Sequence, residues 1–140
     1  MSSVRKKDQT PHRLTVLDAI LDMYEHTIKV TDNPKIFNAQ YKELTESIRS
    51  EARLIYHYCR TANEDLDNRI EDEALERLRL QREALKLCSD LKTDIMLAKK
   101  VFHLRAQKQI AWTKYVNAVI PLIQSWHKSE KANYKEKFGS

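Results

Sequence analysis

Glycine and proline are nearly missing from this sequence of 140 residues, which holds one glycine, at position 139, and three prolines. Sheet structures need these residues at their tight turns, so their scarcity argues against a β fold. It also excludes the glycine-rich phosphate loop and the dinucleotide-binding fingerprint, because each requires several flexible backbone positions. The sequence therefore predicts an all-α protein outside two large classes of nucleotide-binding enzyme.

The patterns that hold metals or perform catalysis are also missing. The two cysteines, Cys59 and Cys88, lack zinc-site spacing, and none of the five histidines forms an HxxxH pair. No glutamate stands three residues before a histidine, as di-iron bundles require, and no paired carboxylates occupy predicted core positions. We therefore expect no enzyme activity, no catalytic residues, no metal, no cofactor and no small-molecule substrate. Both cysteines are expected to be buried, reduced thiols.

Long apolar runs are absent as well. No stretch reaches the length of a membrane span, and the N-terminal residues include basic side chains but no apolar core of a secretory signal. With 41% hydrophobic and 32% charged residues, the composition is typical of one globular domain. These features predict a cytoplasmic protein with no membrane partner.

Residues 68–102 form the longest uninterrupted helical pattern, rich in Leu, Ala, Arg, Glu, Gln and Lys. At about 100° per residue, one apolar stripe contains Ile70, Ala74, Gln81, Leu85, Cys88 and Ile95. A second stripe beside it contains Leu80, Leu87, Leu91 and Ala98. Two readings of the second stripe remain open. Leu80, Leu87 and Leu91 either contact another subunit or belong to a wide core within one chain.

Three further helices are predicted, over about residues 12–30, 38–63 and 106–131. The first places Leu14, Leu17, Ile20, Leu21, Tyr24 and Ile28 on its apolar stripe. Asp67 is a candidate N-cap of the central helix, and Pro121 lies on the polar face of the last helix, where it allows a bend without a break. We expect a disordered basic arm (1–12), an antiparallel up-down-up-down four-helix bundle (13–131) and a polar tail (132–140).

The charges of the sequence are unevenly distributed around a net charge of +5. Residues 62–76 contain seven acids and one base, whereas residues 95–129 contain six bases and no acid. Part of this separation follows from the helix dipole, which favours acids in a first turn and bases in a last turn. The predicted topology gathers one group of bases at a single end of the bundle, which we call the basic pole: Lys35, Lys42, Lys99, Lys100, Arg105 and Lys108.

Clustered bases fit the phosphates of a nucleic acid, and they fit an acidic protein surface equally well. The candidate nucleic-acid contacts are Arg79, Arg82, Lys99, Lys100, Arg105, Lys108 and Lys114. Aromatic side chains suitable for base stacking fit the predicted core better than the surface, so the pattern favours contacts to the backbone of the nucleic acid.

Four segments together resemble one known family: LTVLDAILDMYEHT with NPKIF, EARLIYHYCRTANE, RLRLQREALKLCSDL and IAWTKYVNAVIPLIQSWHKSEKANY. The family is that of the Avd-like (accessory variability determinant) proteins of diversity-generating retroelements. It is related to the four-helix-bundle proteins encoded in intervening sequences of ribosomal RNA genes. The resemblance covers about residues 14–134. Its most family-like positions are Ala62, Asn63, Arg79, Gln81, Ala84, Leu85, Cys88, Leu91, Trp112 and the run from Trp126 to Ser129.

The resemblance implies a four-helix bundle that assembles into a basic pentameric barrel. It also implies a non-enzymatic protein that binds the retroelement's reverse transcriptase and its template RNA or DNA in support of mutagenic copying. Arg79 and Arg82 match basic positions of the family, although Glu76 and Glu83 lie beside them. The alternative hypothesis is a bundle of the ribosomal-insert type that binds a protein and has no nucleic-acid role.

Overall fold

The computed structural model describes residues 11–139, with side chains from Thr15 onwards, and this part of the chain is helical without any strand. Its four long helices are α2 (Pro11–Thr31), α3 (Lys42–Arg60), α4 (Glu71–Phe102) and α5 (Ala106–Phe138). A 3₁₀ turn, η1 (Ala39–Tyr41), precedes α3, and a π turn, η2 (Thr61–Asp65), follows it. The predicted all-α class and four-helix content are confirmed. None of the described helices has both the length and the apolarity to cross a bilayer.

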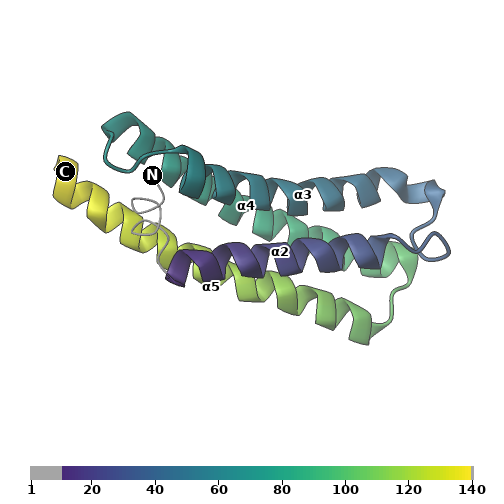
Figure 1. Cartoon of the computed structure of the whole chain (residues 1–140). Coiled ribbons are helices and arrows are strands. Elements are labelled where there is room, and N and C mark those ends of the chain that lie inside the picture. The colour runs from purple at the N-terminus through teal and green to yellow at the C-terminus, as the bar shows by residue number, and fades with distance from the viewer. Residues whose placement is uncertain (1–10, 140) are drawn as a thin grey trace.

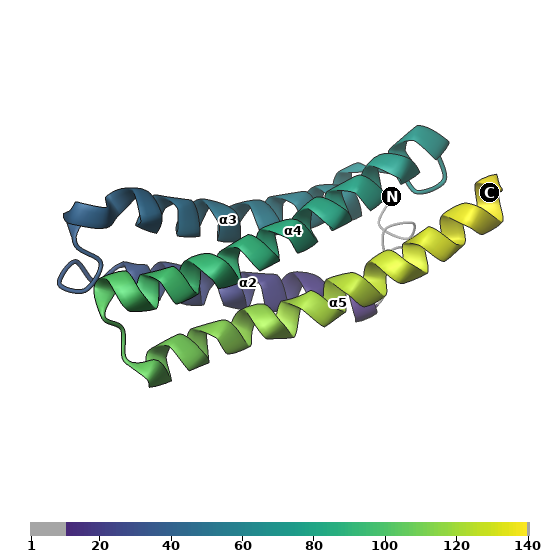
Figure 2. The same cartoon turned by 180° about the vertical axis from the view of Figure 1, so that it is seen from behind.

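Each helix packs against the next one along the chain, and α2 also packs against α5, which closes the four into a bundle. The connections from α2 to α3 and from α4 to α5 lie at the same end (Figure 1). The α3–α4 connection and the C-terminus lie at the other end, where α5 extends past the start of α2 (Figure 2). The predicted basic pole therefore brings together residues of two separate connections.

The core is a continuous apolar cluster that contains side chains from all four helices. The largest fully buried side chains include Trp112, Ile20, Met23, Ile48 and Ile95. Both cysteines are free and buried, and burial raises the pKa of Cys59 above its usual range and that of Cys88 to about 12. The prediction of two buried, free thiols is therefore confirmed.

Helix α2 presents a different face to the core from the one predicted. Its fully buried side chains are Val16, Ile20, Met23 and Thr27, whereas Leu21 and Ile28 are 43% and 41% exposed. The predicted stripe is thus rotated by roughly a quarter turn of the helix. Two hydrogen bonds of Thr27 account for this rotation. The Thr27 hydroxyl accepts the indole N–H of Trp112 at 3.0 Å and donates to the Met23 carbonyl at 2.8 Å. A threonine whose hydroxyl is satisfied both as donor and as acceptor can be buried at little cost in free energy. A pattern based on apolar residues alone does not predict that such a threonine is buried.

The start of α4 also differs from the prediction. Asp67 does not cap this helix, which begins at Glu71 after an extended Ile70. The Asp67 carboxylate instead accepts the backbone N–H of Arg69 at 2.9 Å and pairs with its guanidinium at 3.0 Å, which lowers the pKa of Asp67 to about 2. The Glu73 carboxylate accepts the Asp67 N–H at 2.8 Å. These local bonds hold residues 67–70 in a turn.

Helix α5 is longer than predicted, continuing through the expected polar tail to Phe138. Two contacts anchor the extension: Glu130 is buried at 6% exposure, and the Tyr134 hydroxyl donates to Glu71 of α4 at 3.1 Å. Pro121 lies within this one continuous helix and is exposed, as predicted from its place on the polar face. The expected disordered arm falls mostly on residues 1–10, outside the described residues, while positions 11 and 12 belong to α2.

The second apolar stripe of α4 lies mainly inside the chain. Leu80 is 5% exposed, Leu91 and Ala98 are fully buried, and Leu87 is half-buried against the core. Leu80 and Leu91 therefore have almost no area to offer to another subunit. A wide intramolecular core accounts for the stripe because α4 packs between α3 and α5.

Candidate functional site

The surface of α4 is divided along its length by charge. After the first turn its acids are Glu76, Glu83, Asp90 and Asp94, which recur at intervals of seven, seven and four residues and so share one side of the helix. That side faces α3, because Asp94 hydrogen-bonds with Glu51 of α3. The α3-facing side of α4 is therefore acidic.

The opposite side of α4 is basic and adjoins α5. At about 100° per residue, Arg82, Lys92, Lys99 and Lys100 lie on this side, away from the acids. The charges of Arg82 and of Lys131 on α5 both act on His127, which places these two bases around one imidazole. Together with Lys128 on α5, these residues form what we call the basic face: Arg82, Lys92, Lys99, Lys100, Lys128 and Lys131.

The basic face is long and free of carboxylates at its surface. Arg82 and Lys100 are 18 residues apart, or about 27 Å along the helix axis. Between residues 106 and 129, α5 contributes no acid, and Glu130, the first one, is buried. Half-buried Lys92 and Lys99 keep their stems against the bundle, while the other four bases of the face are exposed.

The seven predicted contact residues do not form one surface. Arg82, Lys99 and Lys100 belong to the basic face, and Arg105 and Lys108 lie at the basic pole. Arg79 lies on the α3 side of α4, bound to Glu76 through two contacts of 2.8 and 2.7 Å. Gln109 of α5 contacts Met96 of α4 and donates to the Thr113 hydroxyl, so Thr113 lies on the side of α5 near α4. Lys114 is the next residue, about 100° farther around the α5 axis, and points away from α4. Sequence reasoning missed Lys92, Lys128 and Lys131, which the helical period could have assigned.

A cavity of about 380 Å³ opens at the basic pole. Ile36 from the α2–α3 connection lines it together with His103, Leu104, Arg105 and Lys108 from the α4–α5 connection and the start of α5. His103 is left-handed, with φ 56° and ψ 47°, and its N–H donates to the Lys99 carbonyl as α4 ends. The two connections therefore meet around a recess with three basic or ionisable side chains and no acid in its lining.

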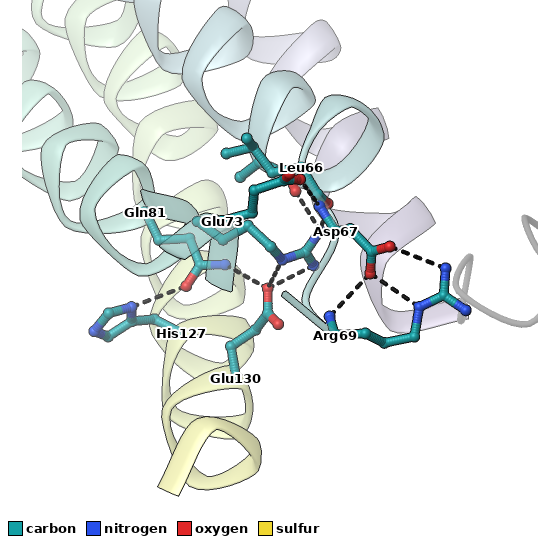
Figure 3. A network of polar contacts seen from close by, with 9 residues as sticks. Leu66, Asp67, Arg69, Glu73, Gln81, His127 and Glu130 are labelled. Atoms are coloured by element: carbon teal, nitrogen blue, oxygen red, sulfur yellow. Dashed lines mark hydrogen bonds and ion pairs between the residues drawn. The ribbon is translucent and has the colours of Figure 1, made fainter. Parts of the chain in front are cut away.

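A buried ion pair joins α4 to α5 at the other end of the bundle (Figure 3). Arg77 is 2% and Glu130 6% exposed, and Oε1 of Glu130 lies 2.8 Å from Nε and 2.6 Å from Nη2 of Arg77. Nη1 of Arg77 also donates to the carbonyls of Ala62 and, at 2.8 Å, of Leu66. The guanidinium thus satisfies carbonyls that the π turn leaves open after α3, and it links α3, α4 and α5.

The same network orients an imidazole on the basic face. Gln81 is fully buried and donates its amide Nε2 to Glu130 Oε1 at 2.9 Å, so its Oε1 points at His127 Nδ1, 2.9 Å away. An amide oxygen can only accept, so Nδ1 must carry a proton, and in the neutral ring Nε2 is left as an acceptor. Burial, followed by the charges of Arg82 and Lys131, lowers the pKa of His127. Both ends of the buried Gln81 amide therefore have polar partners.

Glu51 and Asp94 form a carboxyl pair that the sequence did not predict. Half-buried Glu51 on α3 shares a hydrogen bond with Asp94 on α4. Burial, this bond and the charges of Asp94 and Asp90 raise the pKa of Glu51 to about 8. Positions 51 and 94 are far apart in sequence, and neither belongs to a charge pattern that would predict the pair.

The ionisable groups of the described residues lie at separate places on the bundle. Among residues 15–139 no group of three or more His, Cys, Asp or Glu side chains could hold a metal ion. The carboxyl of Glu51 and the imidazole of His127 lie on different flanks of α4, towards α3 and towards α5, and cannot act on one substrate together. No family model matches this chain, and no curated protein or solved structure matches it either.

Proposed function

We propose that this protein is a non-enzymatic accessory protein of a diversity-generating retroelement, which binds the reverse transcriptase and its template RNA or DNA through a basic surface. One observation carries the nucleic-acid part: the basic face runs about 27 Å along α4 and α5 without an exposed carboxylate. A row of cations without anions concentrates positive potential, which is what phosphate binding by counterion release requires. The retroelement and its reverse transcriptase rest on the sequence resemblance.

The proposal includes an antiparallel up-down-up-down order of the helices and assembly into a homo-oligomer, with five subunits as the resemblance implies. Because Leu80 and Leu91 are buried, the subunit contact would use other apolar side chains. Leu75 and Leu97, which are 47% and 46% exposed on α4, are two candidates among the exposed apolar side chains. Light scattering after size exclusion tests this part, since a mass near five chains supports the barrel and a monomer contradicts it.

The nucleic-acid part is tested by salt dependence with a matched pair of variants. Fluorescence anisotropy would measure the binding of a single-stranded RNA between 50 and 300 mM NaCl. The face variant neutralises four bases of the basic face: Arg82→Gln, Lys92→Gln, Lys100→Gln and Lys131→Gln. The control variant removes the same charge elsewhere: Lys29→Gln, Arg53→Gln, Lys135→Gln and Lys137→Gln.

For the face variant we expect the slope of log K against log salt to become shallower by about 3, since each phosphate contact to a single strand contributes about 0.7. The control variant should change this slope by less than the contribution of one phosphate contact. Equal slopes for the two variants would show that net charge, rather than the basic face, governs binding. A natural protein with no salt-dependent RNA binding would refute the proposal.

A second function is favoured by a separate observation. Met96 and Ile110 are 46% and 53% exposed on α4 and α5, near the basic pole, and bundles that dock proteins use such apolar side chains. We therefore keep the protein-binding bundle of the ribosomal-insert type as the alternative. Co-purification with the reverse transcriptase of the same locus separates the two, because the alternative predicts no complex with that enzyme.

A further inference from the structure

We propose that the cavity at the basic pole binds the terminal nucleotide of a nucleic-acid strand that ends in a phosphate monoester. This inference rests on the proposed function and adds a ligand that the basic face alone does not specify. A volume of about 380 Å³ falls within the usual size of ligand pockets. The cavity lies at the end of the bundle between two connections, where a strand can terminate (Figures 1 and 2).

The lining of the cavity matches the two parts of a nucleotide. Leu104, which is 7% exposed, and half-buried Ile36 offer an apolar wall for a base. Arg105, Lys108 and His103 are exposed and offer donors to a phosphate. A terminal phosphate monoester carries close to two negative charges at neutral pH, whereas a phosphodiester within a strand carries one. Two permanent cations therefore favour the terminal group.

The backbone around the cavity adds donors of its own. Arg105 is the N-cap of α5 and makes no side-chain cap, and the first turn of α5 contains no acid. The N–H groups of Lys108 and Gln109 bond to the Arg105 carbonyl, while those of Ala106 and Gln107 precede the first such bond. A phosphate at Arg105 and Lys108 would meet these two free donors and the positive end of the helix dipole.

His103 lines the cavity and at the same time ends α4. It is the one non-glycine residue with positive φ among the described residues, at a helix end where glycine is the usual residue. A left-handed conformation is strained for a side chain with a Cβ, and such strain is concentrated at functional sites. Because glycine is the usual residue at such a turn, replacing His103 by glycine tests whether the cavity needs the imidazole.

The test compares three forms of one ten-nucleotide single-stranded RNA, with a 5′-phosphate, a 5′-hydroxyl or a 3′-phosphate, by fluorescence anisotropy with the full chain. We expect the two phosphorylated strands to bind about tenfold more tightly than the strand with the 5′-hydroxyl. Competition with inorganic phosphate and with adenosine monophosphate identifies the recognised unit. The nucleotide should displace the strand at lower concentration than phosphate does.

Two pairs of substitutions locate the effect. Arg105→Gln with Lys108→Gln should abolish the preference for a terminal phosphate, whereas Lys135→Gln with Lys137→Gln, which removes the same charge at the far end of α5, should retain it. His103→Gly should raise the melting temperature by about 2–4 °C, because it removes the left-handed strain, and yet weaken the preference several-fold. A merely structural His103 would give the first effect without the second.

The outcomes separate this inference from the proposed function. Equal affinity for all three strands, with a steep salt dependence retained, would refute the cavity site and leave the proposed function standing. A preference that survives Arg105→Gln with Lys108→Gln would likewise refute it. If no strand binds, the proposed function fails, and the absence of any binding of adenosine monophosphate to the free protein would then overturn the cavity site as well.

Discussion

Replacing Glu130 by glutamine should destabilise the bundle severely, although the two side chains have nearly the same shape. Glu130 is 6% exposed, and its Oε1 accepts hydrogen bonds from Arg77 and Gln81 at distances of 2.6–2.9 Å. Without the carboxylate charge, the guanidinium of Arg77, itself 2% exposed, stays buried among neutral acceptors only, the new amide oxygen and the carbonyls of Ala62 and Leu66. Breaking such a pair on one side costs about 3–5 kcal/mol.

That cost is large for a domain of this size. The free energy of unfolding of a natural domain is about 5–15 kcal/mol, so Glu130→Gln would remove a third or more of a typical value. We expect the melting temperature to fall by roughly 10 °C. Urea denaturation followed by circular dichroism at 222 nm measures the change, with the m-value checking that both proteins unfold in the same way.

Two further variants determine whether the buried charge is the cause. Glu76→Gln breaks the exposed pair with Arg79 and should leave the urea midpoint almost unchanged, because water screens that pair. Arg77→Met with Glu130→Leu removes both buried charges but leaves the Ala62 and Leu66 carbonyls and the Gln81 amide without these partners, so it should recover part of the loss. The reasoning is refuted if Glu130→Gln costs less than about 1 kcal/mol, or if the apolar double variant is as unstable as the single one.

Three other predictions concern titration and reactivity. The pKa of Glu51 is raised to about 8, so the fold prefers its protonated form, and the associated stability is lost as pH rises from about 5 to 8. This decline is worth about 1–2 kcal/mol after solvent screening. Glu51→Gln should flatten it in melting curves recorded at pH 5, 6.5 and 8. His127 has a lowered pKa, so its contribution to stability is lost as pH falls below about 6.5. Long-range ¹H–¹⁵N NMR at pH 7.5 should find the proton on Nδ1, and a proton on Nε2 would contradict the Gln81 contact. Cys88, buried and with its pKa raised to about 12, should react with a thiol reagent only at the rate of unfolding, so rapid modification of the native protein would disprove its burial.

Much of the helical architecture was predictable from the sequence because it depends on local properties. The scarcity of glycine and proline and the long runs of helix-forming residues predict four helices, and the place of Pro121 on a polar face predicts one continuous α5. The buried faces of α3 and α4 follow from helical periodicity, as Ile48, Ala52 and Leu91 show. The gathering of basic residues at one end follows from short connections between consecutive helices.

The tertiary structure alone decided how polar groups pair across the bundle. Arg77 and Glu130 are 53 residues apart, and nothing in either local pattern distinguishes them from surface charges. Trp112 turns α2 by bonding to Thr27, and Glu130 with Tyr134 extends α5 past its predicted end. Helix propensity and apolar period act over a few residues, so the sequence by itself determines which segments are helical. A buried polar group is stabilised only by a partner brought close by folding, so the structure determines which faces meet and which charges remain for binding.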